Sequence, residues 1–204
     1  MTSVSSPTRS RAIGILVIVF AVLAAVFALV IAVIPPAVSP DVWSYPTTAL
    51  PFTLGQILIG IHHLVMAAGL FAAWRIGLAG RSRLAAVGAV SATVAMVLFA
   101  ILEVGASVIA DSRLGSDAAA TVGGLYGGLT IVLAAASIVY GVAIVRARQW
   151  TGITRFTVLV TGIYLVLPLI PAQFGPFLLR SIALIIWSLL YIGLGLGLRR
   201  GPKM

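Results

Sequence analysis

The chain contains no cysteine and very few charged residues. The absence of cysteine excludes disulfide bonds, thiolate metal sites, iron–sulfur clusters and a cysteine nucleophile. Only 8% of the 204 residues are charged, whereas a soluble domain carries about 25%. So few charges cannot solvate a globular surface, and 61% of the residues are hydrophobic. We therefore expect lipid, rather than water, to surround most of the chain.

Groups that carry enzyme chemistry are equally scarce. Glu103 is the single carboxylate within a long apolar segment, so the paired carboxylates of an aspartyl intramembrane protease are missing. The two histidines, His62 and His63, are adjacent and cannot ligate one haem from facing helices. HExxH is absent, and the sole lysine, Lys203, lies in the tail. We predict no metal, no cofactor and, on balance, no enzyme activity.

The 13 cationic residues fall almost entirely into four clusters separated by long apolar stretches, and the three aspartates lie in the gaps between the clusters. This alternation is the pattern that the positive-inside rule produces in a multi-pass membrane protein. It predicts an all-α bundle of six transmembrane helices with both termini in the cytoplasm. The clusters are Arg9 and Arg11; Arg75, Arg81 and Arg83; Arg146, Arg148 and Arg155; and Arg199, Arg200 and Lys203.

One transmembrane domain, residues 12–198, follows from this pattern. A polar tail, residues 1–11, is expected to be disordered, and residues 199–204 form a basic tail. The fifth span is short and contains proline, so a re-entrant segment is the alternative. Five crossings would place the last basic cluster outside, which favours six. The predicted spans are residues 12–34, 54–74, 84–110, 121–145, 156–170 and 177–198.

The N-terminal apolar run and the net charge of the chain also bear on its cellular compartment and its binding partners. The first apolar run, 23 residues long, exceeds the core of a cleaved secretory signal, which is about 7–15 residues. The formal charge of +9 suggests nucleic acid, but the basic residues form no face with aromatic residues, so anionic lipid headgroups are the expected counter-charge. The arginine- and alanine-rich usage resembles proteins of GC-rich bacterial genomes. We predict a multi-pass protein of the plasma membrane.

Small residues at four-residue spacing are typical of helix contacts in lipid, because they let backbones approach closely. The fourth span carries two such overlapping pairs, and the sixth span carries another. Gly88 and Ala92 form a similar pair in the third span. The glycines predicted to pack helices are Gly123, Gly124, Gly127, Gly128, Gly193 and Gly197.

Ionisable groups at membrane depth are costly, at about 2.5–3.5 kcal/mol each on insertion scales. Glu103 lies about 10 Å from the outer end of its span at the helical rise of 1.5 Å per residue. Because adjacent residues point about 100° apart, His63 shares a small, polar face with Gln56, while His62 lies among apolar residues. We expect His63 and Gln56 to face the bundle interior, and Arg180 to reach the outer interface.

An ionised Glu103 needs a partner, and Arg180 is the first candidate by charge, followed by His63. One hypothesis is a structural clamp between helices. The other is a ligand or proton pathway formed by Glu103, His63, Gln56 and Arg180, which would serve passage of a small solute or protons. The alternative function is a non-catalytic accessory subunit. Its expected partners are the lipid bilayer and either a membrane-protein partner or further copies of the chain.

Overall fold

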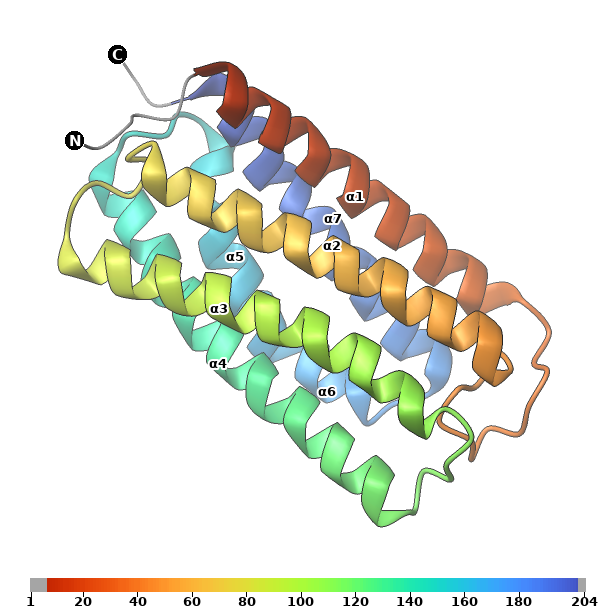
Figure 1. Cartoon of the computed structure of the whole chain (residues 1–204). Helices are drawn as coiled ribbons and strands as arrows, with labels where there is room; N and C mark the ends of the chain where they lie inside the picture. Colours follow the sequence, from red (N-terminus) through yellow and green to blue (C-terminus); the bar gives the residue numbers. More distant parts are fainter. Residues whose placement is uncertain (1–6, 202–204) are drawn as a thin grey trace.

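The computed structural model describes residues 7–201, and within that range the chain is helical, with one isolated β-bridge and no strand. Within these described residues, six helical segments are long and apolar enough to span a membrane (Figure 1). The elements are α1 (Pro7–Val33), α2 (Ala49–Arg75), α3 (Arg83–Ala106), η1 (Ser107–Ile109), α4 (Asp117–Ala147), η2 (Ile153–Phe156), α5 (Thr157–Tyr164), η3 (Leu165–Leu169), α6 (Ile170–Gln173) and α7 (Phe177–Arg200).

The helices extend further than the apolar runs that predict them. α1 begins at Pro7, a residue type favoured in the first helical turn, so residues 7–11 of the expected tail are helical. Residues 1–6 and 202–204 of the two predicted tails lie outside the described residues. At the other end, Arg199 and Arg200 form the last turn of α7 rather than the start of a tail.

The fifth segment is a continuous helical stretch over residues 153–173. The structure therefore contains a long helix here, and it does not contain the re-entrant segment that was the alternative. Pro168 lies inside the stretch, in the π-helical turn η3. Proline has no N–H to donate and its ring crowds the preceding turn, so a local widening of the helix accommodates it. This explains why the apolar run looks weak although the helix continues.

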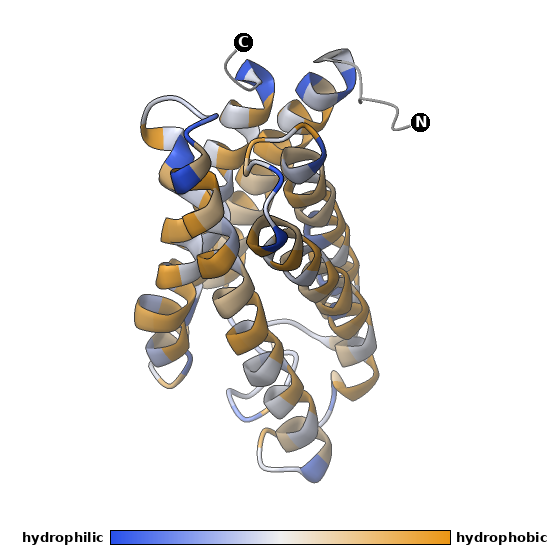
Figure 2. Ribbon diagram, turned by 90° about the vertical axis from the view of Figure 1, so that its left-hand side faces the viewer, coloured by the Kyte–Doolittle hydropathy of each residue, from blue (hydrophilic) through white to orange (hydrophobic). Residues whose placement is uncertain are grey.

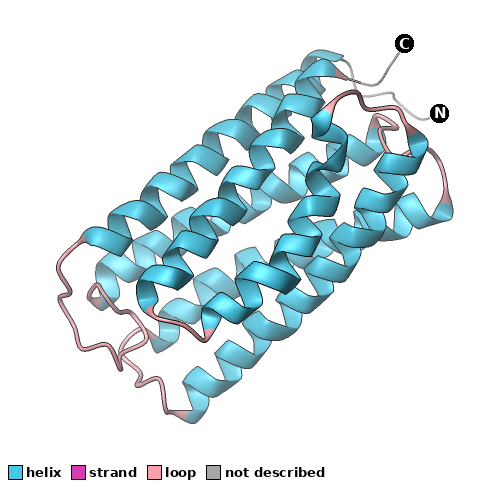
Figure 3. Ribbon diagram, turned by 180° about the vertical axis from the view of Figure 1, so that it is seen from behind, coloured by secondary structure: helices cyan, strands magenta, loops and turns pink. Residues whose placement is uncertain are grey.

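The helices form a closed ring in the order α1, α2, α3, α4, α5 and α7, and α7 returns to pack extensively on α1. Both described ends of the chain lie at the same end of the bundle (Figures 1 and 3). We call this the basic end, because the arginine clusters gather there: Arg9, Arg11, Arg75, Arg81, Arg83, Arg146, Arg148, Arg155, Arg199 and Arg200. The other end carries Asp41, Asp111 and Asp117.

Hydrophobic residues predominate along the helices between these two polar ends (Figure 2). Leu16, Leu23 and Val30 of α1 are each about half exposed, and similar residues recur on every long helix. A water-soluble monomer rarely exposes so large an apolar surface. The six apolar helices therefore suggest a membrane protein.

Small residues bring the helix backbones together in the half of the bundle nearer the basic end. A Cβ at Gly88 of α3 would lie 2.7 Å from the backbone nitrogen of Tyr140 in α4. A Cβ at Gly195 of α7 would lie 2.6 Å from the carbonyl oxygen of Gly14 in α1. Within α7, Gly193 lies against Thr157 and Gly197 lies against the Trp150 indole. These glycines are required for close approach.

The four glycines in the first half of α4 do not follow this expectation. A Cβ added at Gly123, Gly124, Gly127 or Gly128 would meet no atom of the described chain within 4 Å. All four are exposed. The expected packing by these residues is therefore not found within the chain, because this part of α4 presents them to the outside of the ring. These glycines have the four-residue spacing that favours helix contact, but no helix of the described chain lies against them.

Two loops pack on each other at the end opposite the basic end. The backbone N–H of Trp43 donates to the Ser112 carbonyl, and that of Leu114 donates to the Asp41 carbonyl. An ion pair of 3.3 Å joins the Arg113 guanidinium to the Asp41 carboxylate. The loop between α1 and α2 is thereby fixed to the loop between α3 and α4.

Candidate functional site

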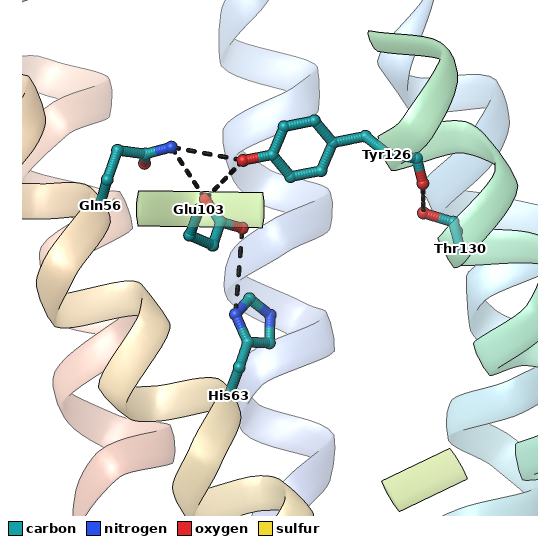
Figure 4. A network of polar contacts seen from close by, with 5 residues as sticks. All are labelled: Gln56, His63, Glu103, Tyr126 and Thr130. Atoms are coloured by element: carbon teal, nitrogen blue, oxygen red, sulfur yellow. Dashed lines mark hydrogen bonds and ion pairs between the residues drawn. The ribbon is translucent and has the colours of Figure 1, made fainter. Parts of the chain in front are cut away.

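The most densely connected polar cluster surrounds Glu103 in α3. Gln56 of α2 donates from Nε2 to Glu103 Oε2 at 2.8 Å, and the Tyr126 hydroxyl of α4 donates to the same oxygen at 2.8 Å (Figure 4). A longer contact of 3.4 Å from Gln56 Nε2 to the Tyr126 oxygen closes the triangle. The Glu103 residue is only 8% exposed. Three neighbouring helices therefore meet at one carboxyl group.

The two oxygens of this carboxyl group have different environments. Oε2 already accepts two hydrogen bonds, whereas Oε1 points towards His63 and lies 3.9 Å from its Nδ1 (Figure 4). That separation is longer than a hydrogen bond, so a small rotation or one water molecule would join the two groups. Because Oε2 is occupied by donors, a proton on this carboxyl group belongs on Oε1, the oxygen that faces His63.

His63 lies deep in the bundle and is 1% exposed. Its ring stacks on Phe99 at a centroid distance of 5.4 Å and contacts Trp187 of α7 at 5.6 Å. Among the described residues, neither ring nitrogen has a hydrogen-bond partner of good geometry, and the ring interacts with the backbone of Ile59, one turn earlier in α2, without meeting that geometry. Buried polar groups in proteins are normally paired with protein or ordered water. The imidazole of His63 can therefore accept a further hydrogen bond, and the Glu103 carboxyl group is the nearest charged candidate.

His62 is also buried, but against a different helix. Its Nδ1 lies 3.1 Å from the Phe20 carbonyl oxygen of α1, and since a carbonyl can only accept, Nδ1 carries the proton. The His62 ring lines a small groove between α1 and α2 with Phe20 and Phe27. The two histidines thus have separate surroundings, as their angular separation on the helix predicts. His62 binds α1 to α2, while His63 faces Glu103.

Arg180 does not pair with Glu103, contrary to the expectation from charge. No ion pair between the two occurs among residues 7–201, and the Arg180 guanidinium lies 5.9 Å from the centre of the Phe177 ring. The reason is the order of the helices. α7 packs on α1, α5 and α2, while Glu103 belongs to α3. Arg180 therefore stays half-buried near the start of its own helix.

Three aromatic residues at or near the site were not anticipated from the sequence: Tyr126, which belongs to the Glu103 cluster, Trp187, which contacts His63, and Tyr191, which contacts Trp187. Tyr126 lies between the glycine pairs 123–124 and 127–128 of α4, and its sequence context carries no sign of a polar partner. Trp187 and Tyr191 are one turn apart in α7 and contact each other at a ring-centroid distance of 6.0 Å. An aromatic residue in an apolar segment is a core residue by default, so only the three-dimensional contacts identify these.

The arrangement around Glu103 joins α2, α3 and α4 and would serve as a clamp in any case. Within residues 7–201, no group of three histidine, aspartate or glutamate side chains comes together as metal ligands. Comparison with protein-family models, with curated proteins and with solved structures found no match to this chain. The functional assignment therefore depends on the geometry of the cluster.

Proposed function

We propose that this chain is a multi-pass protein of the plasma membrane, with its basic end in the cytoplasm, and that it passes protons or a small solute. Glu103 binds the proton or solute in the half of the bundle away from the basic end, and His63 exchanges a proton or hydrogen bond with Glu103. The basic end faces the cytoplasm because arginine clusters are retained on that side during insertion.

The unequal environment of the two Glu103 oxygens carries this proposal. A carboxyl group that served only as a clamp would gain most by engaging both oxygens with fixed donors. Here Oε2 accepts from Gln56 and Tyr126, while Oε1 is left opposite a buried histidine without side-chain hydrogen bonds. Intramembrane carboxyl and imidazole groups in this relation are typical of proton relays.

Glu103→Gln tests the proposal. In proteoliposomes with an imposed membrane potential, proton entry is followed with a trapped pH-sensitive dye. The amide keeps the size of the side chain and its acceptor oxygen but cannot exchange a proton, so flux is expected to fall to the level of empty liposomes. Thermal unfolding in detergent is the control for folding. A Glu103→Gln variant that remains folded and conducts as wild type would contradict the proposal.

A second candidate function is that of an accessory subunit, and the bare face of α4 favours it. Gly123, Gly124, Gly127 and Gly128 meet nothing within the described chain, although such residues commonly allow helices to approach in lipid. The occupant would be a helix of a membrane-protein partner or of a second copy. Crosslinking from a cysteine at Gly127 separates the possibilities. A crosslink to a second copy indicates an oligomer, and a stoichiometric crosslink to another protein indicates an accessory subunit. If no protein is crosslinked, the chain acts alone, as the transport proposal requires.

A further inference from the structure

We infer that the transported species is a proton and that its path continues from Glu103 towards the basic end through His63 and the Tyr191 hydroxyl, with the Trp187 indole beside it. This inference rests on the proposed function, because it describes the other half of the same path. It assigns roles to Trp187 and Tyr191, two residues of α7 outside the Glu103 cluster.

Successive ring contacts connect these groups. The His63 ring contacts Trp187 at 5.6 Å, and Trp187 contacts Tyr191 at 6.0 Å in an edge-to-face arrangement. α2 and α7 supply them from two neighbouring helices. At 1.5 Å per residue, Glu103 lies about 30 Å along α3 from its basic end, and Tyr191 lies about 14 Å along α7 from its own. The series therefore leads from one half of the bundle to the other.

Buried polar atoms without partners mark the same series. The Trp187 indole nitrogen and the Tyr191 hydroxyl have no hydrogen-bond partner of good geometry in the described chain. Trp187 is 7% exposed, and Tyr191 is 2% exposed. The indole interacts with the Tyr191 oxygen without meeting hydrogen-bond geometry. Leaving such groups unpaired is costly, so their position beside His63 indicates that they form transient hydrogen bonds.

The packing of the rings selects the species. Centroid distances of 5.4–6.0 Å around His63 and Trp187 are those of rings in contact, so a solute cannot pass without displacing them. A proton needs only hydrogen bonds and single water molecules. His62 is the other titratable group next to His63, with ring centroids 5.5 Å apart, but its Nδ1 is engaged by the Phe20 carbonyl.

The steps balance without any redox change. Glu103 transfers its Oε1 proton to His63 Nδ1 and becomes a carboxylate. The imidazolium ring then turns and releases this same proton from Nδ1 to a water molecule beside Tyr191, so His63 keeps its Nε2 proton throughout. The Tyr191 oxygen accepts a proton from that water and gives its own hydroxyl proton to water on the side of the basic end. The Trp187 indole can only donate, so it orients the water. Glu103 then takes a proton from the opposite end, and the neutral His63 ring turns back.

The test compares two buried tyrosines of the same half of the bundle. Tyr191→Phe removes a hydroxyl without a good partner, whereas Tyr140→Phe removes a hydroxyl that donates to the Leu70 carbonyl at 3.1 Å. The protein is reconstituted in one orientation, protons are released on either side, and protonation of Glu103 is followed by its infrared carboxyl band. That band is identified as the one absent from Glu103→Gln.

Tyr191→Phe is expected to slow the response of Glu103 to protons released at the basic end by about 10²-fold, the lower range for a positioned proton-transfer group. Its response to release at the opposite end stays as in wild type. Trp187→Phe slows the same response and keeps an aromatic ring in place, so it serves if Tyr191→Phe does not fold. Tyr140→Phe lowers thermal stability and leaves both responses unchanged.

A wild-type rate in folded Tyr191→Phe and Trp187→Phe would overturn the inference, and so would equal slowing in Tyr140→Phe. If Glu103→Gln still abolishes flux in that case, the proposed function stands and only this path is wrong. A Glu103 band that responds to protons from neither side would contradict both.

Discussion

Glu103 depends on two hydrogen-bond donors from different helices, and Tyr126 is the donor whose removal isolates one bond. Tyr126→Phe keeps the ring but removes the 2.8 Å bond to Oε2, leaving Gln56 in place. We expect the free energy of unfolding in detergent to fall by about 0.6–1.5 kcal/mol, the range for a single buried hydrogen bond in membrane and soluble proteins. Thermal unfolding measures it, with Tyr45→Phe as a control outside the cluster. No difference between the variants would show that the bond contributes nothing.

The adjacent histidines offer a matched pair at the same depth. His62→Asn places an amide N–H near the position of Nδ1, so the hydrogen bond to the Phe20 carbonyl can be retained. His63→Asn removes the ring opposite Glu103 Oε1. We expect proton flux in proteoliposomes to persist in His62→Asn and to be lost in His63→Asn. The reverse result would place the path on the α1 side of α2.

The direction in which a side chain points from its own helix could be predicted from the sequence, but the partner that it meets on a neighbouring helix could not. The angular separation of His62 and His63 and the shared face of His63 and Gln56 follow from the turn of one helix. The partner of Glu103 depends on which helices are adjacent, and charge alone suggested Arg180. The order of helices in the ring cannot be predicted from the apolar segments, because all six have similar hydrophobicity and no segment specifies its neighbour.

Among the elements, α3 and α4 give a contrast between two glycines with equal sequence signals. Gly88→Ala would place a methyl group 2.7 Å from a Tyr140 backbone atom, while Gly127→Ala would meet open space. We expect Gly88→Ala to destabilise the bundle by about 1–3 kcal/mol through overpacking. Gly127→Ala should cause no loss, since helix preference alone favours alanine by about 1 kcal/mol.

Thermal unfolding of the two variants in the same detergent checks this contrast. A large loss in Gly127→Ala would mean that the face of α4 is covered, which would favour an oligomer or a partner subunit. Equal stability of Gly88→Ala and wild type would contradict the close approach of α3 and α4.

The loops at the end opposite the basic end contain a titratable contact outside the membrane spans. A hydrogen bond from Ser39, backbone hydrogen bonding and the Arg113 charge hold the pKa of Asp41 below its usual range, and desolvation opposes this only in part. A lowered folded-state pKa stabilises the loops at neutral pH, and the effect is lost only as the pH falls through that lowered value.

Asp41→Asn is therefore expected to lower Tm slightly at pH 7, because the pair is exposed and screened by solvent. The difference from wild type should persist at mildly acidic pH and vanish below the usual titration range of aspartate. Tm measured across pH in both proteins tests this. A difference that vanished near pH 6 would assign the contact to another group.

The lengths of the elements were predictable in their apolar parts only. Helix ends at Pro7 and Arg200 extend into polar residues, because backbone hydrogen bonding continues beyond the apolar residues. The fifth segment looked too short because Pro168 interrupts the apolar run, yet a π-helical turn keeps it continuous. The number of long helices was predictable from charge and hydropathy, and the structure confirms six.

For the whole molecule, the proposed function requires a bundle that crosses the plasma membrane with its basic end inside the cell. The gathering of arginines at one end of the ring and the apolar outer faces of the helices support this arrangement. The chain has no cysteine, so single cysteines can be introduced without a background. Gly115 and Thr151 are exposed loop positions at opposite ends.

Labelling of intact cells with a membrane-impermeant thiol reagent is the most direct test. A cysteine at Gly115 should react in intact cells, and one at Thr151 should react only after the cells are opened. Reaction at Thr151 with protection at Gly115 would invert the bundle and contradict the account, and equal reaction of both in intact cells would show that the helices do not separate the two ends.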